Sequence, residues 1–66
     1  MSFCEKLKEC RAAAGLSQDD VAKKVGITQA AYSYIEKGLK MPSLPVATSL
    51  AKALNTSLDY LTDNNQ

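Results

Sequence analysis

Lysines gather in one part of the chain, and their ammonium groups are the most evident chemistry that the sequence offers. Residues 21–41 hold four lysines against one glutamate, a net charge of +3, whereas residues 1–20 and 42–66 each carry −1. The four are Lys23, Lys24, Lys37 and Lys40. Clustered ammonium groups attract phosphates and form the electrostatic footprint of a nucleic-acid-binding surface. An ordinary solvated face would carry the same residues.

Other chemistries lack the residues that they need. The chain has no His and two cysteines, Cys4 and Cys10, so a zinc site has almost no ligands to draw on. The cysteines lie six positions apart on one predicted helix and point in different directions, so they cannot bridge each other. No nucleophile–base pair and no glycine-rich phosphate loop is present, which argues against an enzyme. We therefore expect no metal, no cofactor and no small-molecule ligand.

The length and composition favour one small helical domain over residues 1–66. A chain of 66 residues buries only about 60% of its unfolded surface, so stability must come from efficient packing, dimerisation or both. No run of about 18 apolar residues is present to span a membrane. No basic segment followed by an apolar one opens the chain as a secretory signal would. These features, with reduced cysteines, predict a cytoplasmic protein.

The first half of the chain predicts two capped helices. A helix over 3–14 would begin after Ser2, with Glu5 completing a capping box, and would end at Gly15. Its apolar face would consist of Phe3, Leu7, Cys10 and Ala14. A second helix would begin after Ser17 and end at Gly26. It would bury Val21, Ala22 and Val25, with Ile27 filling the turn that follows.

Three further helices are predicted after that turn. Thr28 would cap a helix over 29–37 that ends at Gly38 and buries Ala31, Tyr32 and Ile35. Ser43 would cap the next helix, which ends at Asn55 and buries Leu44, Ala47, Leu50, Ala51 and Leu54. Ser57 would cap a last short helix with Leu58 and Leu61 inward, before a frayed polar tail over 62–66. Two short helices joined by a tight turn, as in 16–38, are the geometry that lays one helix into a DNA major groove.

Several of these segments together resemble the phage-repressor-like helix-turn-helix proteins, the Cro/C1-type or XRE family. The matching segments are LSQDDVAKKVGITQ, YSYIEKG, the Pro42-Ser43-Leu44 start of a helix, and ALNTSLDYL. Leu7, the Cys10-Arg11 pair and Gly15 also fall where that family places an apolar residue, an apolar–Arg pair and a glycine. The resemblance covers about residues 3–61. It implies an all-α, five-helix lambda-repressor-like domain in which helices 2 and 3 form the helix-turn-helix.

The resemblance also implies which residues meet double-stranded DNA. The base-reading positions are Gln29, Ala30, Ser33 and Tyr34, and the backbone-contacting positions are Gln18, Thr28, Lys37 and Lys40. A glutamine at position 29 can pair with adenine N6 and N7, and Gln18 would touch a phosphate and brace Gln29. Three positions depart from the pattern. Cys10 replaces an aliphatic residue, Ala30 offers only an apolar contact to a thymine methyl, and Tyr34 is large enough to lie along the backbone instead.

Two structural expectations accompany these roles. Arg11 and Glu36 lie near the inward faces of helices that pack together in the family, which predicts a partly buried ion pair; two separate surface charges are the alternative.

The family's two-fold dimer requires exposed apolar surface. The candidates are Leu58, Tyr60, Leu61, Met41 and Leu44, with Tyr60 expected to point outward.

The sequence as a whole therefore predicts a sequence-specific DNA-binding transcriptional regulator. We expect a repressor that acts as a homodimer on an inverted-repeat operator. The alternative is a protein-interaction module, such as an antitoxin-like partner with secondary DNA binding. Exposed apolar surface beyond the need of a dimer would favour that alternative.

Overall fold

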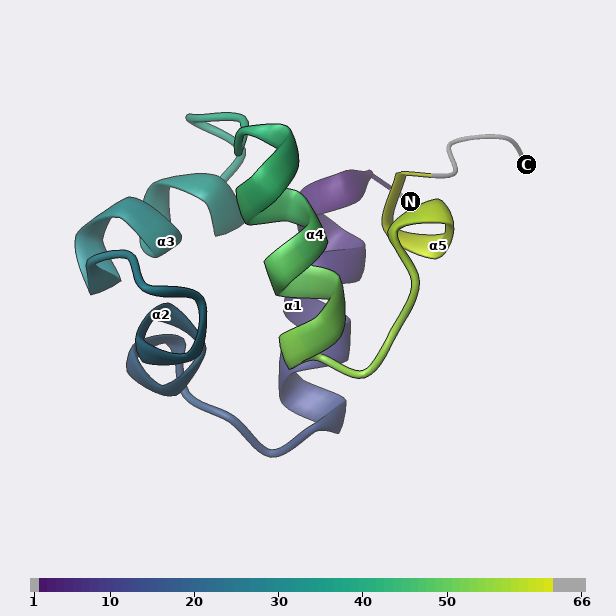
Figure 1. Cartoon of the computed structure of the whole chain (residues 1–66), viewed down its shortest axis with the longest axis horizontal. Helices are drawn as coiled ribbons and strands as arrows, with labels where there is room; N and C mark the ends of the chain where they lie inside the picture. Colours follow the sequence, from purple (N-terminus) through teal and green to yellow (C-terminus); the bar gives the residue numbers. More distant parts are fainter. Residues whose placement is uncertain (1, 63–66) are drawn as a thin grey trace.

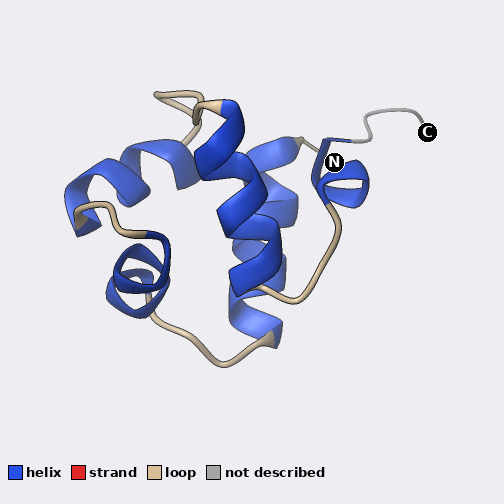
Figure 2. Ribbon diagram, viewed as in Figure 1, coloured by secondary structure: helices blue, strands red, loops and turns tan. Residues whose placement is uncertain are grey.

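Five helices make up the part of the chain that the computed structural model describes, residues 2–62 (Figures 1 and 2). They are α1 (Phe3–Ala13), α2 (Gln18–Val25), α3 (Gln29–Glu36), α4 (Leu44–Ala53) and α5 (Leu58–Thr62). The all-α, five-helix fold predicted from the sequence is confirmed. No helix among residues 2–62 is long and apolar enough to cross a membrane.

One apolar core joins the five helices. In Figure 1, α4 crosses in front of α1, α2 and α3 lie together on one side of them, and α5 lies on the other. Each helix contributes at least one buried side chain to the core. These are Leu7 from α1; Val21 and Ala22 from α2; Tyr32 and Ile35 from α3; Leu50 and Ala51 from α4; Leu54 just after it; and Leu61 from α5.

Capping hydrogen bonds set the start of the first four helices. The hydroxyls of Ser2, Ser17, Thr28 and Ser43 each accept a hydrogen bond from the backbone N–H three residues on. These bonds satisfy N–H groups that have no partner within the helix. The local sequence therefore determines where each of these helices begins, as the spacing of the caps predicted.

The structure corrects several predicted boundaries and core positions. Helix α1 ends at Ala13, so Ala14 is its exposed C-cap and not part of the core. Helix α3 ends at Glu36, with Lys37 as its C-cap. Leu44, predicted as a core residue, is the first residue of α4 and is 70% exposed. Thr62, predicted as tail, ends α5, and residues 63–66 lie outside the described residues.

Helix α5 is attached to α1 by a side chain from the N-terminal helix. The ammonium nitrogen of Lys6 lies 5.1 Å from the centroid of the Tyr60 ring and donates to the Tyr60 carbonyl oxygen at 3.1 Å. A cation over an aromatic face is attracted by the negative charge density of the ring. This contact supplements the burial of Leu61, the buried residue of α5.

Truncating a buried and an exposed leucine of α4 should affect the stability of the domain very differently. Leu50→Ala removes a fully buried side chain and should lower the free energy of unfolding by about 2–5 kcal/mol. Leu44→Ala removes a side chain that is exposed in the single chain, and it should change the free energy of unfolding of the monomer by less than about 0.5 kcal/mol. Urea denaturation of the two variants measures the difference. Equal losses would contradict this assignment of the core.

Candidate nucleic-acid interface

The start of α2 is fixed by a reciprocal pair of hydrogen bonds. The Ser17 hydroxyl accepts from the Asp20 N–H at 3.0 Å, and the Asp20 carboxylate accepts from the Ser17 N–H at 3.0 Å. These bonds favour the ionised carboxylate and hold the pKa of Asp20 below its ordinary value. The N-terminal turn of α2, which carries Gln18, is therefore held in one conformation.

A tight turn joins α2 to α3. Gly26 ends α2 with a φ of 79°, a left-handed conformation that glycine adopts without steric cost. The N–H groups of Gly26 and Ile27 both donate to the Ala22 carbonyl, at 2.9 and 3.0 Å. Ile27 packs against the core, and Thr28 then caps α3 by accepting from the Ala31 N–H at 3.0 Å. With two residues between the C-cap of one helix and the start of the next, the turn permits little variation in how α3 leaves α2.

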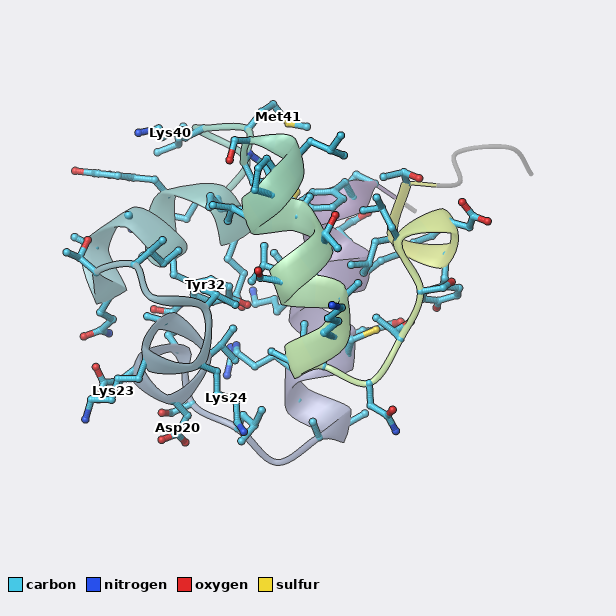
Figure 3. The ribbon with its side chains drawn as sticks, in the orientation of Figure 1. Asp20, Lys23, Lys24, Tyr32, Lys40 and Met41 are labelled. Atoms are coloured by element: carbon cyan, nitrogen blue, oxygen red, sulfur yellow. The ribbon has the colours of Figure 1, made fainter. Side chains whose placement is uncertain are left out.

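Helix α3 has a buried face and an exposed face. Tyr32, Ile35 and Glu36 are buried, and Figure 3 shows Tyr32 directed toward the interior between the helices. On the other side Gln29 and Ala30 are exposed and Tyr34 is 51% exposed, whereas Ser33 is half-buried. Three of the four expected base-reading residues are thus accessible to a partner molecule.

The lysines of residues 21–41 are all exposed. Figure 3 shows Lys23 and Lys40 projecting from the side of the molecule that α2 and α3 form. Lys23 pairs with Asp19, at 3.1 Å between Nζ and Oδ2, and an ion pair this exposed contributes little to stability. Within residues 2–62, Lys37 and Lys40 make no ion pair, so their charges are available at the end of α3 and in the loop beyond it.

Glu36 is the buried charged group of this region, at 7% exposure. Its Oε2 accepts from Arg11 Nε at 2.6 Å and from the Tyr32 hydroxyl at 2.8 Å. Its Oε1 accepts from Arg11 Nη2 at 3.2 Å and from Gln18 Nε2 at 2.8 Å. Arg11 also donates through Nη1 to the Leu16 carbonyl oxygen at 2.8 Å. We call these four side chains, Arg11, Gln18, Tyr32 and Glu36, the Glu36 network.

The network keeps Glu36 and Arg11 ionised. Burial raises the pKa of Glu36, but the hydrogen bonds from Arg11, Gln18 and Tyr32 outweigh it, and the net pKa lies below its ordinary value. The hydrogen bond to Glu36 raises the pKa of Arg11. Burial and the neighbouring carboxylate raise the pKa of the Tyr32 phenol, so Tyr32 stays a neutral donor. The network is a buried ion pair with two neutral donors.

The structure places Gln18 differently from the sequence-based expectation. Its amide nitrogen donates to Glu36, and no bond to Gln29 is present among residues 2–62. The Tyr32 hydroxyl bond was also missed, although positions 32 and 36 are one helical turn apart and the i, i+4 spacing was available as a signal. The Gln18 bond carries no such local signal, because it joins α2 to the end of α3.

The apolar residues expected at a dimer interface divide into two groups. Leu61 is fully buried, so its assignment to the interface is wrong, and Leu58 is half-buried against the core. Met41, Leu44 and Tyr60 are exposed. Met41 lies in the loop that precedes α4 (Figure 3), and with Leu44 it lines an apolar hollow of about 350 Å³. The other lining residues are Phe3, Pro42, Ala47, Leu58 and Thr62.

The two cysteines are free and half-buried. Cys4 Sγ lies 3.3 Å from the Ser2 hydroxyl oxygen at the start of α1. Among residues 2–62, no three His, Cys, Asp or Glu side chains are grouped so that they could hold a metal ion.

Comparison with known proteins finds similarity along most of the chain. A family model described as helix-turn-helix matches residues 7–61. The uncharacterized HTH-type transcriptional regulator YqaE of Bacillus subtilis (strain 168) is 41% identical over 59 residues; the match covers 89% of this chain and 51% of that relative. The chain thus spans about half the length of that relative.

Solved structures share the fold. The P22 c2 repressor protein, in complex with the synthetic operator 9T, has a TM-score of 0.91 at 28% identity, covering 98% of each chain. The restriction-modification controller protein C.AhdI from Aeromonas hydrophila has a TM-score of 0.85 at 34% identity, covering 89% of each. The similarity therefore includes α2, the turn and α3.

The Glu36 network predicts graded losses of stability. Arg11→Met leaves a buried carboxylate without its cation and should lower the free energy of unfolding by about 3–5 kcal/mol. Tyr32→Phe removes one donor of several and should lower it by about 1–2 kcal/mol. Lys8→Met, at an exposed position of α1, is the control and should have little effect. Urea denaturation ranks the three, and an Arg11→Met variant as stable as Lys8→Met would show that the pair is not needed.

Proposed function

The chain belongs to the helix-turn-helix family of Cro/C1-type DNA-binding transcriptional regulators, and on this premise we propose that it represses transcription as a homodimer bound to an inverted-repeat operator. The observation that carries the proposal is the accessible outer face of α3, held at a fixed angle by α2 and the turn. The fold of a repressor in complex with its synthetic operator supports the same use of that face.

Helix α3 is proposed to enter the major groove by its N-terminal half. Gln29 then offers an amide that can donate and accept at the adenine edge, and Ala30 offers a methyl group for a thymine methyl. Ser33 and Tyr34 follow one turn later along the same helix. The Tyr34 hydroxyl and ring are exposed enough to reach either a base or the sugar-phosphate backbone.

The backbone of the DNA is proposed to be held from both ends of α3. Lys37 and Lys40, which make no ion pair among residues 2–62, supply charge at the C-terminal end. Thr28 and Gln18 lie at the starts of α3 and α2, where N–H groups of the first turn favour an anion. Phosphate contacts of this kind set register and affinity, and base contacts set specificity.

A dimer is proposed because one recognition helix covers few base pairs. Two copies related by a two-fold axis double the contacts and bind linked half-sites with a higher effective affinity. The exposed apolar residues Met41, Leu44 and Tyr60 are the proposed contact surface. Because Tyr60 also lies beneath Lys6, Met41 and Leu44 are the cleaner positions to test.

The base-reading role of Gln29 can be separated from a charge role. Gln29→Ala should weaken binding to the selected operator by about 1–3 kcal/mol and relax the base preference at one position per half-site. Lys40→Ala should instead weaken binding to all duplexes about equally. It should also reduce, by about one, the slope of the logarithm of the binding constant against the logarithm of the salt concentration. Selection from a random DNA pool followed by salt titrations measures both. If Gln29→Ala keeps the base preference of the wild type, Gln29 does not read a base and this assignment is refuted.

The dimer predicts a fixed geometry of the operator. Half-site centres should lie about 34 Å apart on one face of the duplex, and inserting five base pairs should rotate one half-site by about half a turn and abolish the tight complex. Leu44→Asp should weaken self-association and DNA binding together while the monomer stays helical, because Leu44 is exposed. Sedimentation and gel-shift titrations measure both. A protein that is monomeric at micromolar concentration, and binds one half-site as tightly as two, would contradict the dimer.

A further inference from the structure

The apolar hollow beside Leu44 is built jointly by three helices and the loop before α4. Phe3 comes from α1, Met41 and Pro42 from the loop, Leu44 and Ala47 from α4, and Leu58 and Thr62 from α5. Its volume is about 350 Å³, and a dry protein cavity of about 150 Å³ already admits a benzene molecule. The hollow therefore has room for an aliphatic side chain, and it is complete only while α5 is in place.

A projecting leucine stands at the edge of the same hollow. Leu44 is 70% exposed, and Met41, which also lines the hollow, is 72% exposed. A two-fold axis places the same patch of two copies face to face, so a patch that holds both a projecting side chain and a hollow can fit itself. None of the lining residues carries a charge, so two copies meet there without repulsion between like charges. These features favour a second copy of this chain as the occupant over a charged partner.

Lys6 holds α5 in the position that completes the hollow. Its ammonium group lies over the Tyr60 ring and donates to the Tyr60 carbonyl oxygen. The apolar attachment of α5 is small, since Leu61 is its buried residue and Leu58 is half-buried. A helix with so little buried apolar surface depends on the contacts at its surface. Loss of the Lys6 contact should therefore leave α5 undocked in a substantial share of the molecules.

We propose that the hollow receives Leu44 of a second copy, and that Lys6 controls self-association by keeping α5 docked. This inference rests on the proposed function, in which the protein binds DNA as a homodimer, and it adds the occupant of the hollow and the helix on which the interface depends. Lys6 is a positioning residue, because it lines no part of the hollow and acts through α5. Both copies must have α5 docked, so the docked fraction counts once for each copy in the apparent affinity of the dimer.

The role of Lys6 is tested by sedimentation equilibrium of the whole chain without DNA, at a temperature where circular dichroism shows every variant folded. Lys6→Met should raise the dimer dissociation constant about tenfold, as expected if α5 stays docked in about a third of the copies. Lys6→Arg keeps a cation and a donor and should associate within about twofold of the wild type. Lys8→Met, at an exposed position of the same helix, is the matched control and should associate as the wild type does. A Lys6→Met variant that associates as tightly as Lys8→Met would refute the role of Lys6.

DNA binding separates a role in assembly from a general loss of structure. Helix α5 packs on α1 and α4, whereas α3 packs on α1 and α2. Binding of Lys6→Met to a duplex with one half-site should therefore stay within about twofold of the wild type, and its binding to two linked half-sites should weaken. The duplexes are those that the wild-type protein selects from a random pool. An equal loss of affinity for both duplexes would show that Lys6 supports the whole domain and would overturn the inference.

The occupant of the hollow is identified by NMR on the unmodified protein. In a mixture of isotope-labelled and unlabelled chains, nuclear Overhauser effects between copies should connect the Leu44 methyl groups with the ring of Phe3, the one phenylalanine of the chain. A dimer without these effects would use another surface, which would overturn this inference and leave the proposed dimer intact. A protein that stays monomeric with and without a selected duplex would overturn both. A dimer that shows these effects but selects no duplex would support the occupied hollow and overturn the operator-binding part of the proposed function.

Discussion

A single buried carboxylate determines how α3 is held. Glu36 is the last residue of α3, and the groups that bind it come from α1, from the start of α2 and from α3 itself. A buried charge without partners would be strongly destabilising, so these helices can pack only in an arrangement that brings the donors to it. Apolar packing alone is non-directional and would tolerate small rotations of α3. The hydrogen bonds to Glu36 add the direction that packing lacks.

The turn between α2 and α3 constrains one end of α3, and the Glu36 network constrains the other. At its N-terminal end, Gly26 and Ile27 leave little freedom between the helices, and the Thr28 cap fixes the first turn. At its C-terminal end, Glu36 is bound to Arg11 and Gln18. A short helix fixed at both ends presents its exposed face in one orientation, as the proposed base-reading role of that face requires.

Much of the fold was predictable from the sequence because its signals are local. Caps, C-terminal glycines and the apolar spacing of each helix depend on residues within one or two turns, and the four N-caps are where the sequence places them. The errors occur where tertiary packing decides. Leu44 and Leu61 are both predicted to face inward, but in the packed structure Leu61 is buried and Leu44 is exposed. The orientation of Gln18 is another such case, since its partner lies 18 positions along the chain. The Arg11–Glu36 contact followed from helix register together with the family resemblance, and the residues proposed to meet DNA rest on the same resemblance.

The attachment of α5 has a consequence for how the domain opens. This helix has five residues, one of them fully buried, and its exposed Tyr60 is held from outside by Lys6. Segments with little buried apolar surface detach at a lower free energy than the rest of a domain. Helix α5 packs on α1 and α4, whereas the contacts that hold α3 come from α1 and α2. Thermal fluctuations are therefore expected to release α5 first, as a separate subglobal unit, while α3 keeps its hydrogen-bonded supports. We therefore expect α5 to open often and the rest of the domain to open rarely. In an amide hydrogen-exchange experiment, the amides of α5 would exchange faster than those of the other helices.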